Sequence, residues 1–308
     1  MEYQKPKIQF YKVRTFGEIL NISFEFLRET WKPLLKYSFY LILPVCLLQS
    51  FAMDAYMRLA FSGSLADGNE DFTSLVLNYG IVMLCIICGS SILSAMVYGL
   101  MQTYDRRENR LSDLTFADFK EALVKNLIKI GRTFLFFFGV TLLLVILIGF
   151  LTAASTWTLL VTIPVLLIGL VVVVVPLMLF IPLYLFEDLP FFEALNKAWG
   201  YGFSTWGELF LVMLVFGLLA GIINTVTAIP WYVVQIAGQV FSLVEPDSGV
   251  NSALWYRFAT YLLGILQAYG TYIGSIVSTV GVAFQYFRVR EKKEGVSVRA
   301  NIANFDRL

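Results

Sequence analysis

The chain has 308 residues, of which 58% are hydrophobic and 15% charged, and its formal net charge is +1. A soluble globular domain carries about 45–50% apolar and about 25% charged residues, so this composition excludes an ordinary soluble domain. The net charge gives no reason to expect a nucleic-acid partner. We therefore predict an all-α integral membrane protein.

Six segments meet or approach the length of a membrane-spanning helix, which is about 20 mostly apolar residues. In chain order the predicted spans are 37–59, 75–101, 134–151, 157–186, 209–229 and 253–287. The stretch 231–243 either lengthens the fifth span or lies in the membrane interface. Pro164, Pro176 and Pro182 predict kinks in the fourth span, whereas Pro230 is expected to end a helix.

A half-polar helix precedes the first and the fifth span. FGEILNISFEFLRETWKPLLKY (16–37) aligns without a gap on FFEALNKAWGYGFSTWGELFLV (191–212). Each pattern predicts an amphipathic helix in the membrane interface, with tryptophan at headgroup depth. The expected anchors of these two helices are Phe16, Glu18, Trp31, Phe191, Glu193, Trp199 and Trp206.

A weaker third copy precedes the third span. In it Phe119 and Glu121 match Phe16 and Glu18, and Phe134 stands where the tryptophans stand. The chain is thus predicted to be one membrane domain of three parallel repeats, each an interfacial helix plus a transmembrane hairpin. The predicted repeats are 14–104, 114–187 and 190–288, followed by a cytoplasmic tail at 289–308.

The distribution of basic residues predicts the orientation. Lysine and arginine are frequent in residues 5–36, 106–132 and 288–307, and absent from 62–72, 152–156 and 241–252. Both chain ends are therefore expected on the cytoplasmic side, and all three interfacial helices with them. Only Arg58 and Arg257, at the outer ends of the first and sixth spans, oppose the trend. We expect no cleaved signal peptide, the first span serving as the targeting signal.

The chain lacks the residues that most catalytic mechanisms need. The chain has no histidine, which removes the commonest general base and metal ligand. Cys85 and Cys88 form a CxxC inside the second span, where a thiolate would be desolvated, so they and Cys46 are expected to be packing residues. We therefore expect no enzymatic activity, no cofactor and no metal.

Ionisable residues are absent from the middle of every predicted span. Asp54 and Arg58 lie one helical turn apart at the outer end of the first span and are expected to pair. Because an ion-coupled carrier usually needs a carboxylate within the membrane, this scarcity argues against one.

Small and neutral polar residues are the remaining candidates for function within the spans. The set is Gly89, Ser91, Ser94, Asn224, Gln267, Gly270, Gly274 and Ser278. Small residues at four-residue spacing let helices approach closely, so helix packing is the simplest interpretation. The alternatives are a polar cavity and a dimer interface.

The repeated pattern supports one resemblance. An E-A-L interfacial helix, a tryptophan and a span, with the acidic Glu187-Asp188 turn before FFEAL (191–195), resemble a broad group of bacterial polytopic membrane proteins. This group includes the membrane domain attached to some glycerophosphodiester phosphodiesterases. The resemblance implies a six-span helical fold, which we expect in the bacterial cytoplasmic membrane, and no established chemistry. The soluble phosphodiesterase domain has no counterpart in this sequence.

These features favour a non-enzymatic membrane protein that binds membrane lipids or holds a membrane or cytoplasmic protein partner. The rival hypothesis is a transporter or channel for a lipid or uncharged solute, with a path lined by the second, fourth and sixth spans. A polar cavity lined by Ser91, Asn224 or Gln267 would favour the rival, and a solidly packed bundle centre would disfavour it.

Overall fold

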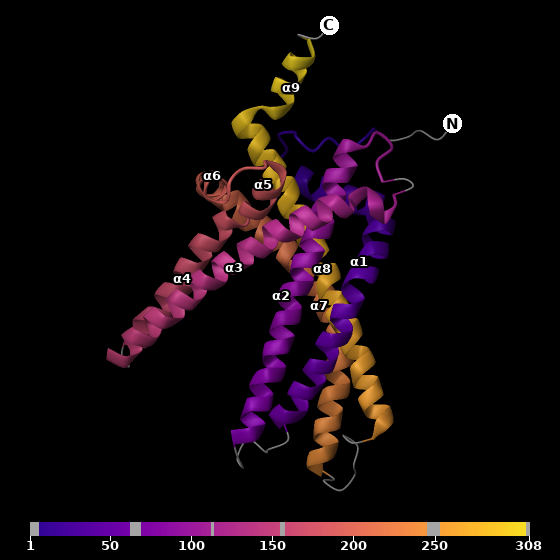
Figure 1. The fold of residues 1–308 in the computed structure, drawn as a ribbon, viewed down its shortest axis with the longest axis vertical. Helices are drawn as coiled ribbons and strands as arrows, with labels where there is room; N and C mark the ends of the chain where they lie inside the picture. The colour runs from indigo at the N-terminus through magenta and orange to yellow at the C-terminus, as the bar shows by residue number, and fades with distance from the viewer. Residues whose placement is uncertain (1–5, 62–68, 112–113, 155–157, 245–252, 306–308) are drawn as a thin grey trace. The chain divides into compact units, whose positions relative to one another are not determined.

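The computed structural model describes residues 6–61, 69–111, 114–154, 158–244 and 253–305 (Figure 1). Every regular element in these ranges is a helix, which confirms the predicted all-α class. The helices are α1 (Phe16–Phe61), α2 (Asn69–Arg106), α3 (Phe116–Ala154), α4 (Thr158–Leu177), α5 (Phe180–Phe186), α6 (Phe191–Ser204), α7 (Trp206–Val244), α8 (Leu254–Glu294) and α9 (Val296–Phe305).

Five helices in the described ranges are long and apolar enough to cross a membrane. Their apolar stretches are Phe16–Ala60, Thr73–Arg106, Phe116–Phe150, Ile163–Phe186 and Trp206–Phe241. These helices indicate an integral membrane protein, as the composition predicts. The predicted sixth span lies in α8, which is not among the five because residues such as Gln267 and Thr271 make it less apolar. The six-span count therefore stays a prediction.

α1 and α3 begin with the same kind of side-chain cap. The backbone N–H of Thr15 donates to the Glu18 carboxylate at 2.6 Å, and that of Thr115 donates to Asp118 at 2.7 Å. Each carboxylate satisfies a backbone donor that the first helical turn leaves free, and it lies at the positive end of the helix dipole. These caps explain why the two helices start where they do.

In two of the three copies the interfacial helix and the span form one continuous helix. α1 and α3 each run without a break from the amphipathic segment into the apolar one. Pro33 lies inside α1 without ending it, since a proline removes only one hydrogen bond of the ladder. In the third copy α6 and α7 are separate, and Thr205 between them leaves the helical conformation at φ −130°.

The prolines act differently from the sequence-based expectation at two positions. The predicted fourth span is split after Pro176, and Pro182 is the third residue of the short helix α5, where its missing N–H has no intrahelical partner to lose. Pro230 lies inside α7, which continues to Val244, so the prediction that it ends a helix is wrong. The stretch 231–243 accordingly lengthens α7.

Contacts divide the chain into two compact units. Unit 1 comprises Met1–Thr30, Val97–Val215 and Thr279–Leu308, and unit 2 comprises Trp31–Met96 and Phe216–Ser278. The boundaries fall within α1, α2, α7 and α8. They do not follow the three predicted repeats.

Unit 1 has an aromatic centre that includes the N-terminal segment. Phe10 is 2% exposed and stacks on Tyr104 and on Phe287, with ring centroids 5.6 Å and 4.9 Å apart. The backbone N–H of Ile8 donates to the Tyr104 hydroxyl at 3.2 Å. The residues before α1 are thus part of the folded unit.

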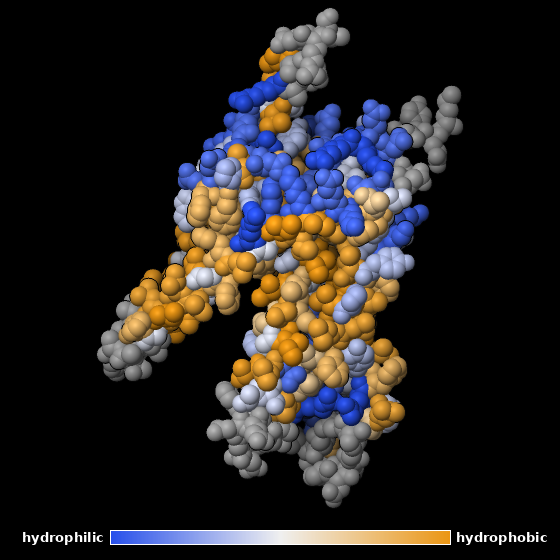
Figure 2. All heavy atoms as spheres, viewed as in Figure 1, coloured by the Kyte–Doolittle hydropathy of each residue, from blue (hydrophilic) through white to orange (hydrophobic). Residues whose placement is uncertain are grey.

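The α3–α4 hairpin of unit 1 turns its apolar side chains outward. Leu143, Phe150 and Ile168 are 67%, 73% and 67% exposed. Figure 2 shows hydrophobic residues along the arm that this hairpin forms beyond the charged first turns of α3. Such a surface suits lipid tails rather than water.

Unit 2 consists of parts of α1, α2, α7 and α8 that approach closely at glycines. A Cβ added at Gly270 of α8 would lie 2.0 Å from Oγ1 of Thr227 on α7. A Cβ at Gly89 of α2 would lie 2.3 Å from the Tyr272 hydroxyl oxygen on α8. The missing side chains allow these helix contacts.

Candidate functional site

A buried carboxylate at the end of α5 holds three helices of unit 1 together. The side chain of Glu187 is 4% exposed. It accepts a hydrogen bond of 2.9 Å from the Tyr286 hydroxyl, and it pairs with Nε of Arg290 at 3.3 Å and with Lys197. Partners of this kind are required because an unpaired buried charge is strongly destabilising.

Glu294 extends the same cluster at the end of α8. It pairs with Lys197 and Arg290 and accepts a hydrogen bond of 2.6 Å from the Tyr201 hydroxyl. Burial alone would raise the pKa of Glu294, but the hydrogen bonds from Lys197, Tyr201 and Arg290 lower it to about 2. We define the Glu187 network as Tyr11, Glu187, Lys197, Tyr201, Tyr286, Arg290 and Glu294.

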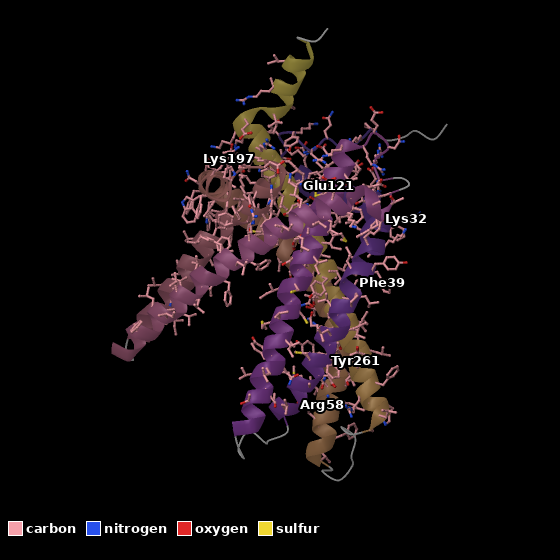
Figure 3. All side chains as sticks on the ribbon, in the orientation of Figure 1. Lys32, Phe39, Arg58, Glu121, Lys197 and Tyr261 are labelled. Atoms are coloured by element: carbon pink, nitrogen blue, oxygen red, sulfur yellow. The ribbon has the colours of Figure 1, made fainter. Side chains whose placement is uncertain are left out.

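The charges of the Glu187 network balance, because two carboxylates face one lysine and one arginine. Arg290 also donates to the Tyr11 hydroxyl at 3.1 Å, which ties the N-terminal segment to α8. Figure 3 labels Lys197 on α6, within this part of unit 1. A balanced and fully paired cluster is suited to fixing the positions of helices rather than to proton transfer.

A cavity of about 510 Å³ lies in unit 1 where the end of α2, the start of α3 and the turn after α5 meet. Its apolar lining comes from Ala122, Leu185 and Phe186. Its charged lining residues are Asp105, Arg106, Arg107, Asp118, Glu121, Lys125 and Asp188. We call it the Arg106 cavity.

Some of these charges are already paired with each other. Arg107 pairs with Asp118 at 3.2 Å, and Lys125 pairs with Asp188 at 2.8 Å. Hydrogen bonds from Lys125 and Lys129 lower the pKa of Asp188 to about 2.

Three charged side chains of the cavity form no ion pair with another residue in the described part of the chain: Asp105, Arg106 and Glu121. Arg106 is the neighbour of Asp105 in the sequence and attracts its carboxylate, whereas Glu121 lies on α3. Glu121 is labelled in Figure 3, on the first turns of α3. Among the described residues, the Arg106 cavity therefore offers one guanidinium and two carboxylates without ion pairs beside an apolar wall.

The turn after α5 serves both the network and the cavity. Asp188 has φ 50°, a left-handed conformation that aspartate tolerates better than most residues. Glu187 contacts α6 and α8, whereas Asp188 contacts Lys125 and Lys129 of α3. Two successive acidic residues thus bind two different sets of helices.

Several predicted interfacial anchors face protein instead of lipid. Phe119 is 0% exposed, so it is not a lipid anchor. Phe191 packs edge-to-face on Phe180, with centroids 5.2 Å apart, and Phe16 is half-buried. Glu18 caps α1. The phenylalanines differ from the prediction because tertiary packing covers the face of an amphipathic helix that the sequence alone leaves open.

The other predicted anchors retain exposed surface. Trp31 is 52% and Trp199 40% exposed, and Glu193 is exposed in the first turn of α6. Trp206 is half-buried and stacks on Phe210, with centroids 5.3 Å apart.

Three buried threonines occupy one position in the three predicted copies. Thr30, Thr133 and Thr205 are 1%, 5% and 6% exposed. Each hydroxyl donates to the carbonyl four residues earlier, at 2.7, 3.0 and 2.9 Å, which satisfies the buried group. Each threonine directly precedes the aromatic residue on which the copies are aligned, namely Trp31, Phe134 and Trp206. Sequence reasoning missed Thr133, although its place before Phe134 was a usable signal.

The neutral polar candidates of unit 2 bond to one another or to nearby carbonyls. Thr271 donates to Asn224 at 2.7 Å, and Gln267 lies 3.4 Å from the Thr271 hydroxyl. Ser278 donates to the Phe216 carbonyl at 3.2 Å, and Ser91 donates to a carbonyl of its own helix. None of them lines the Arg106 cavity.

The small candidate residues lie at helix contacts. A Cβ at Gly274 would lie 2.9 Å from the Ala220 carbonyl oxygen on α7. Ser94 on α2 is half-buried. Together with Gly89 and Gly270, these positions support the packing interpretation more than the polar path.

The predictions for the cysteines hold in part, and the predicted ion pair between Asp54 and Arg58 is present. Cys46 and Cys85 are buried, but Cys88 is exposed, contrary to a packing role for all three. Asp54 and Arg58 pair at 2.9 Å, as predicted. Within the described residues, no group of three or more acidic or cysteine side chains is placed to hold a metal ion.

No family model, no curated protein and no solved structure matches the chain. The resemblance to the phosphodiesterase-associated membrane domain therefore stays a prediction.

Proposed function

We propose that the protein is a non-enzymatic membrane protein that binds a phospholipid headgroup in the Arg106 cavity. The observation that carries this proposal is that Arg106 and Glu121, which have no ion-pair partner among the described residues, line one cavity at the base of a lipid-facing hairpin. Lipid headgroups combine a phosphate with, in several classes, an amine. The cavity offers a partner for each.

The charges of the cavity favour a zwitterionic headgroup. Arginine binds phosphate oxygens through its planar fork of donors, so Arg106 is assigned to the phosphate. Glu121 is assigned to the amine. Acidic residues outnumber basic ones in the lining, so a purely anionic headgroup would meet repulsion. Phosphatidylethanolamine carries the matching groups.

The surface of α3 provides a path for the acyl chains. Glu121 and Lys125 line the cavity, and farther along the same helix Leu135 and Phe138 are 74% and 65% exposed. A lipid with its headgroup in the cavity would lay its tails on this apolar face. The same lipid would cover part of the surface that the protein itself leaves open.

The membrane topology completes the proposal. The basic residues around the Arg106 cavity support a cytoplasmic position for this end of unit 1, by the positive-inside tendency. α8 would be the sixth span, and the three buried threonines support an origin of the chain as three parallel repeats.

The test is native mass spectrometry of the full chain in detergent, titrated with phosphatidylethanolamine. Arg106→Gln is expected to weaken binding about tenfold, because a hydrogen bond to a charged group contributes roughly 1.5–3 kcal/mol. Lys120→Gln is the matched control, since Lys120 lies on α3 and is exposed but does not line the cavity. Equal binding by both variants would refute the proposal.

A second variant tests the assignment of the amine. Glu121→Gln is expected to weaken binding of phosphatidylethanolamine and to leave phosphatidylglycerol, which has no amine, unaffected. If both lipids lose affinity equally, Glu121 does not bind the amine.

A further inference from the structure

Unit 2 contains a second cavity, of about 560 Å³, at the end of α1 and the start of α8. Its aromatic lining residues are Phe51, Trp255, Phe258 and Tyr261, and its charged ones are Asp54, Arg58 and Arg257. Figure 3 labels Arg58 and Tyr261 at this end of the two helices. We call it the Arg257 cavity.

The two arginines of this cavity are the two basic residues that oppose the orientation tendency of the whole chain. They come from segments about 200 residues apart in the sequence, and the fold brings both into one lining. A basic residue on the outer side runs against the positive-inside tendency. The placement of both exceptions in one cavity points to a shared use.

The cavity has an excess of one positive charge. Arg58 pairs with Asp54 at 2.9 Å, and the Thr260 hydroxyl lies 3.4 Å from the same carboxylate. Arg257 is exposed and forms no ion pair within the described residues. Among the described residues, a ligand entering the cavity therefore meets one guanidinium without an ion-pair partner, and the carboxylate of Asp54 is already paired with Arg58.

The surroundings of Arg257 are apolar. Phe51, Trp255 and Phe258 are 61%, 67% and 62% exposed, and all three line the cavity. Exposed rings beside an arginine suit a molecule with an anionic head and an apolar chain. A free inorganic anion would contact the guanidinium but would leave the rings uncovered.

We propose that the Arg257 cavity binds a phosphate group, carried by an apolar chain, with Arg257 as the principal phosphate ligand and the rings of Trp255 and Phe258 against the chain. This site uses none of the residues of the Arg106 cavity, so either site can fail its test without the other. The two sites also differ in the lipid that they prefer: the Arg257 cavity an anionic lipid and the Arg106 cavity a zwitterionic one.

Tryptophan fluorescence provides a direct measurement, because Trp255 lines the cavity. The full chain in detergent is titrated with phosphatidylglycerol brominated on its acyl chains, and the Trp255 signal is obtained by subtracting a Trp255→Phe variant. Brominated phosphatidylglycerol is expected to quench Trp255 at concentrations about tenfold lower than brominated phosphatidylcholine, because both phosphates can bond to Arg257 but the choline cation repels the guanidinium.

The variants identify the phosphate ligand. Arg257→Gln is expected to remove the preference for phosphatidylglycerol. Lys36→Gln, a matched loss of one exposed charge elsewhere in unit 2, is expected to retain it. Equal quenching by the two lipids in the wild type, or an unchanged preference in Arg257→Gln, would overturn the proposal.

A competition arm separates the two possible sources of the phosphate. Inorganic phosphate is added to the chain loaded with brominated phosphatidylglycerol. If millimolar phosphate restores the fluorescence, the site recognises phosphate as such. If quenching persists at constant ionic strength, the apolar chain is required, which is the result expected from the exposed rings. Restoration by an equal concentration of chloride would overturn the proposal.

Discussion

Unit 1 and unit 2 are stabilised by different kinds of polar contact. In unit 1 the Glu187 network joins the N-terminal segment, α5, α6 and α8 through ion pairs and tyrosine hydroxyls. In unit 2 the helices meet at glycines and through neutral hydrogen bonds such as that from Thr271 to Asn224. Among the described residues of unit 2, Asp54 and Arg58 form an ion pair, one helical turn apart near the end of α1.

This difference follows from the cost of moving charges out of water. Ion pairs are useful where water or lipid headgroups solvate their edges, whereas within hydrocarbon the desolvation penalty exceeds the attraction unless every partner is in place. Close backbone packing requires no charge, so it remains effective among lipid tails. The contrast indicates which unit depends on its charges and which depends on its shape.

Among substitutions that test this difference between the units, the largest loss of stability is expected at Glu187. Glu187→Gln should lower the free energy of unfolding by about 3 kcal/mol, because Arg290 and Lys197 lose a buried partner. Unfolding by sodium dodecyl sulfate in mixed micelles, followed by tryptophan fluorescence, measures it. Glu193→Gln, exposed in the first turn of α6, is the control and should change stability little. Equal stability of the two variants would show that the Glu187 network does not hold unit 1.

A smaller loss is expected at the glycine contact of unit 2. Gly270→Ala places a methyl group 2.0 Å from Thr227 Oγ1, so the helices must separate, at a cost of about 2 kcal/mol. The same measurement applies. Gly80→Ala is the matched control, because a Cβ there meets nothing within 4 Å and alanine favours the helix. Should both variants be equally stable, close packing does not explain unit 2.

The smallest effect is a dependence on pH that only unit 1 should show. Folding lowers the pKa of Glu294 from 4.5 to about 2, so its contribution to stability is complete above about pH 4.5 and is lost as the pH falls toward 2. We expect Tm to fall by roughly 2–4 °C over that interval, measured by scanning fluorimetry. Glu294→Gln should reduce the dependence and leave the part that comes from Asp188, whose pKa is also lowered to about 2. An unchanged slope in that variant would assign the effect to another group.

The sequence predicted the parts of the fold that depend on local pattern. Helix type, most apolar stretches and the Asp54–Arg58 pair are encoded within one or two helical turns. The continuity of α7 through Pro230 was not predictable, because neighbouring helices compensate for a missing hydrogen bond and this information is tertiary. The burial of Phe119 was missed for the same reason.

The candidate sites were less predictable than the fold. The acidic Glu187-Asp188 turn was visible in the sequence, but its partners Arg290 and Lys197 come from helices that only folding brings near. Glu121 was assigned to a lipid anchor because it matched Glu18, although one lines a cavity and the other caps a helix. Glu18 and Glu121 occupy equivalent positions in the sequence pattern, but they have different roles because different residues surround them in the fold.

The outward-facing α3–α4 hairpin has a consequence for how this protein tolerates mutation. Leu143, Val145 and the other exposed apolar side chains there make few contacts with the rest of the protein. Substituting one apolar residue for another should therefore be tolerated, provided that the hairpin remains hydrophobic. A single lysine at its midpoint would cost about 2.5–3.5 kcal/mol on insertion scales. Selection on this segment would act on its overall character rather than on individual residues, and alignment methods would recover little from it.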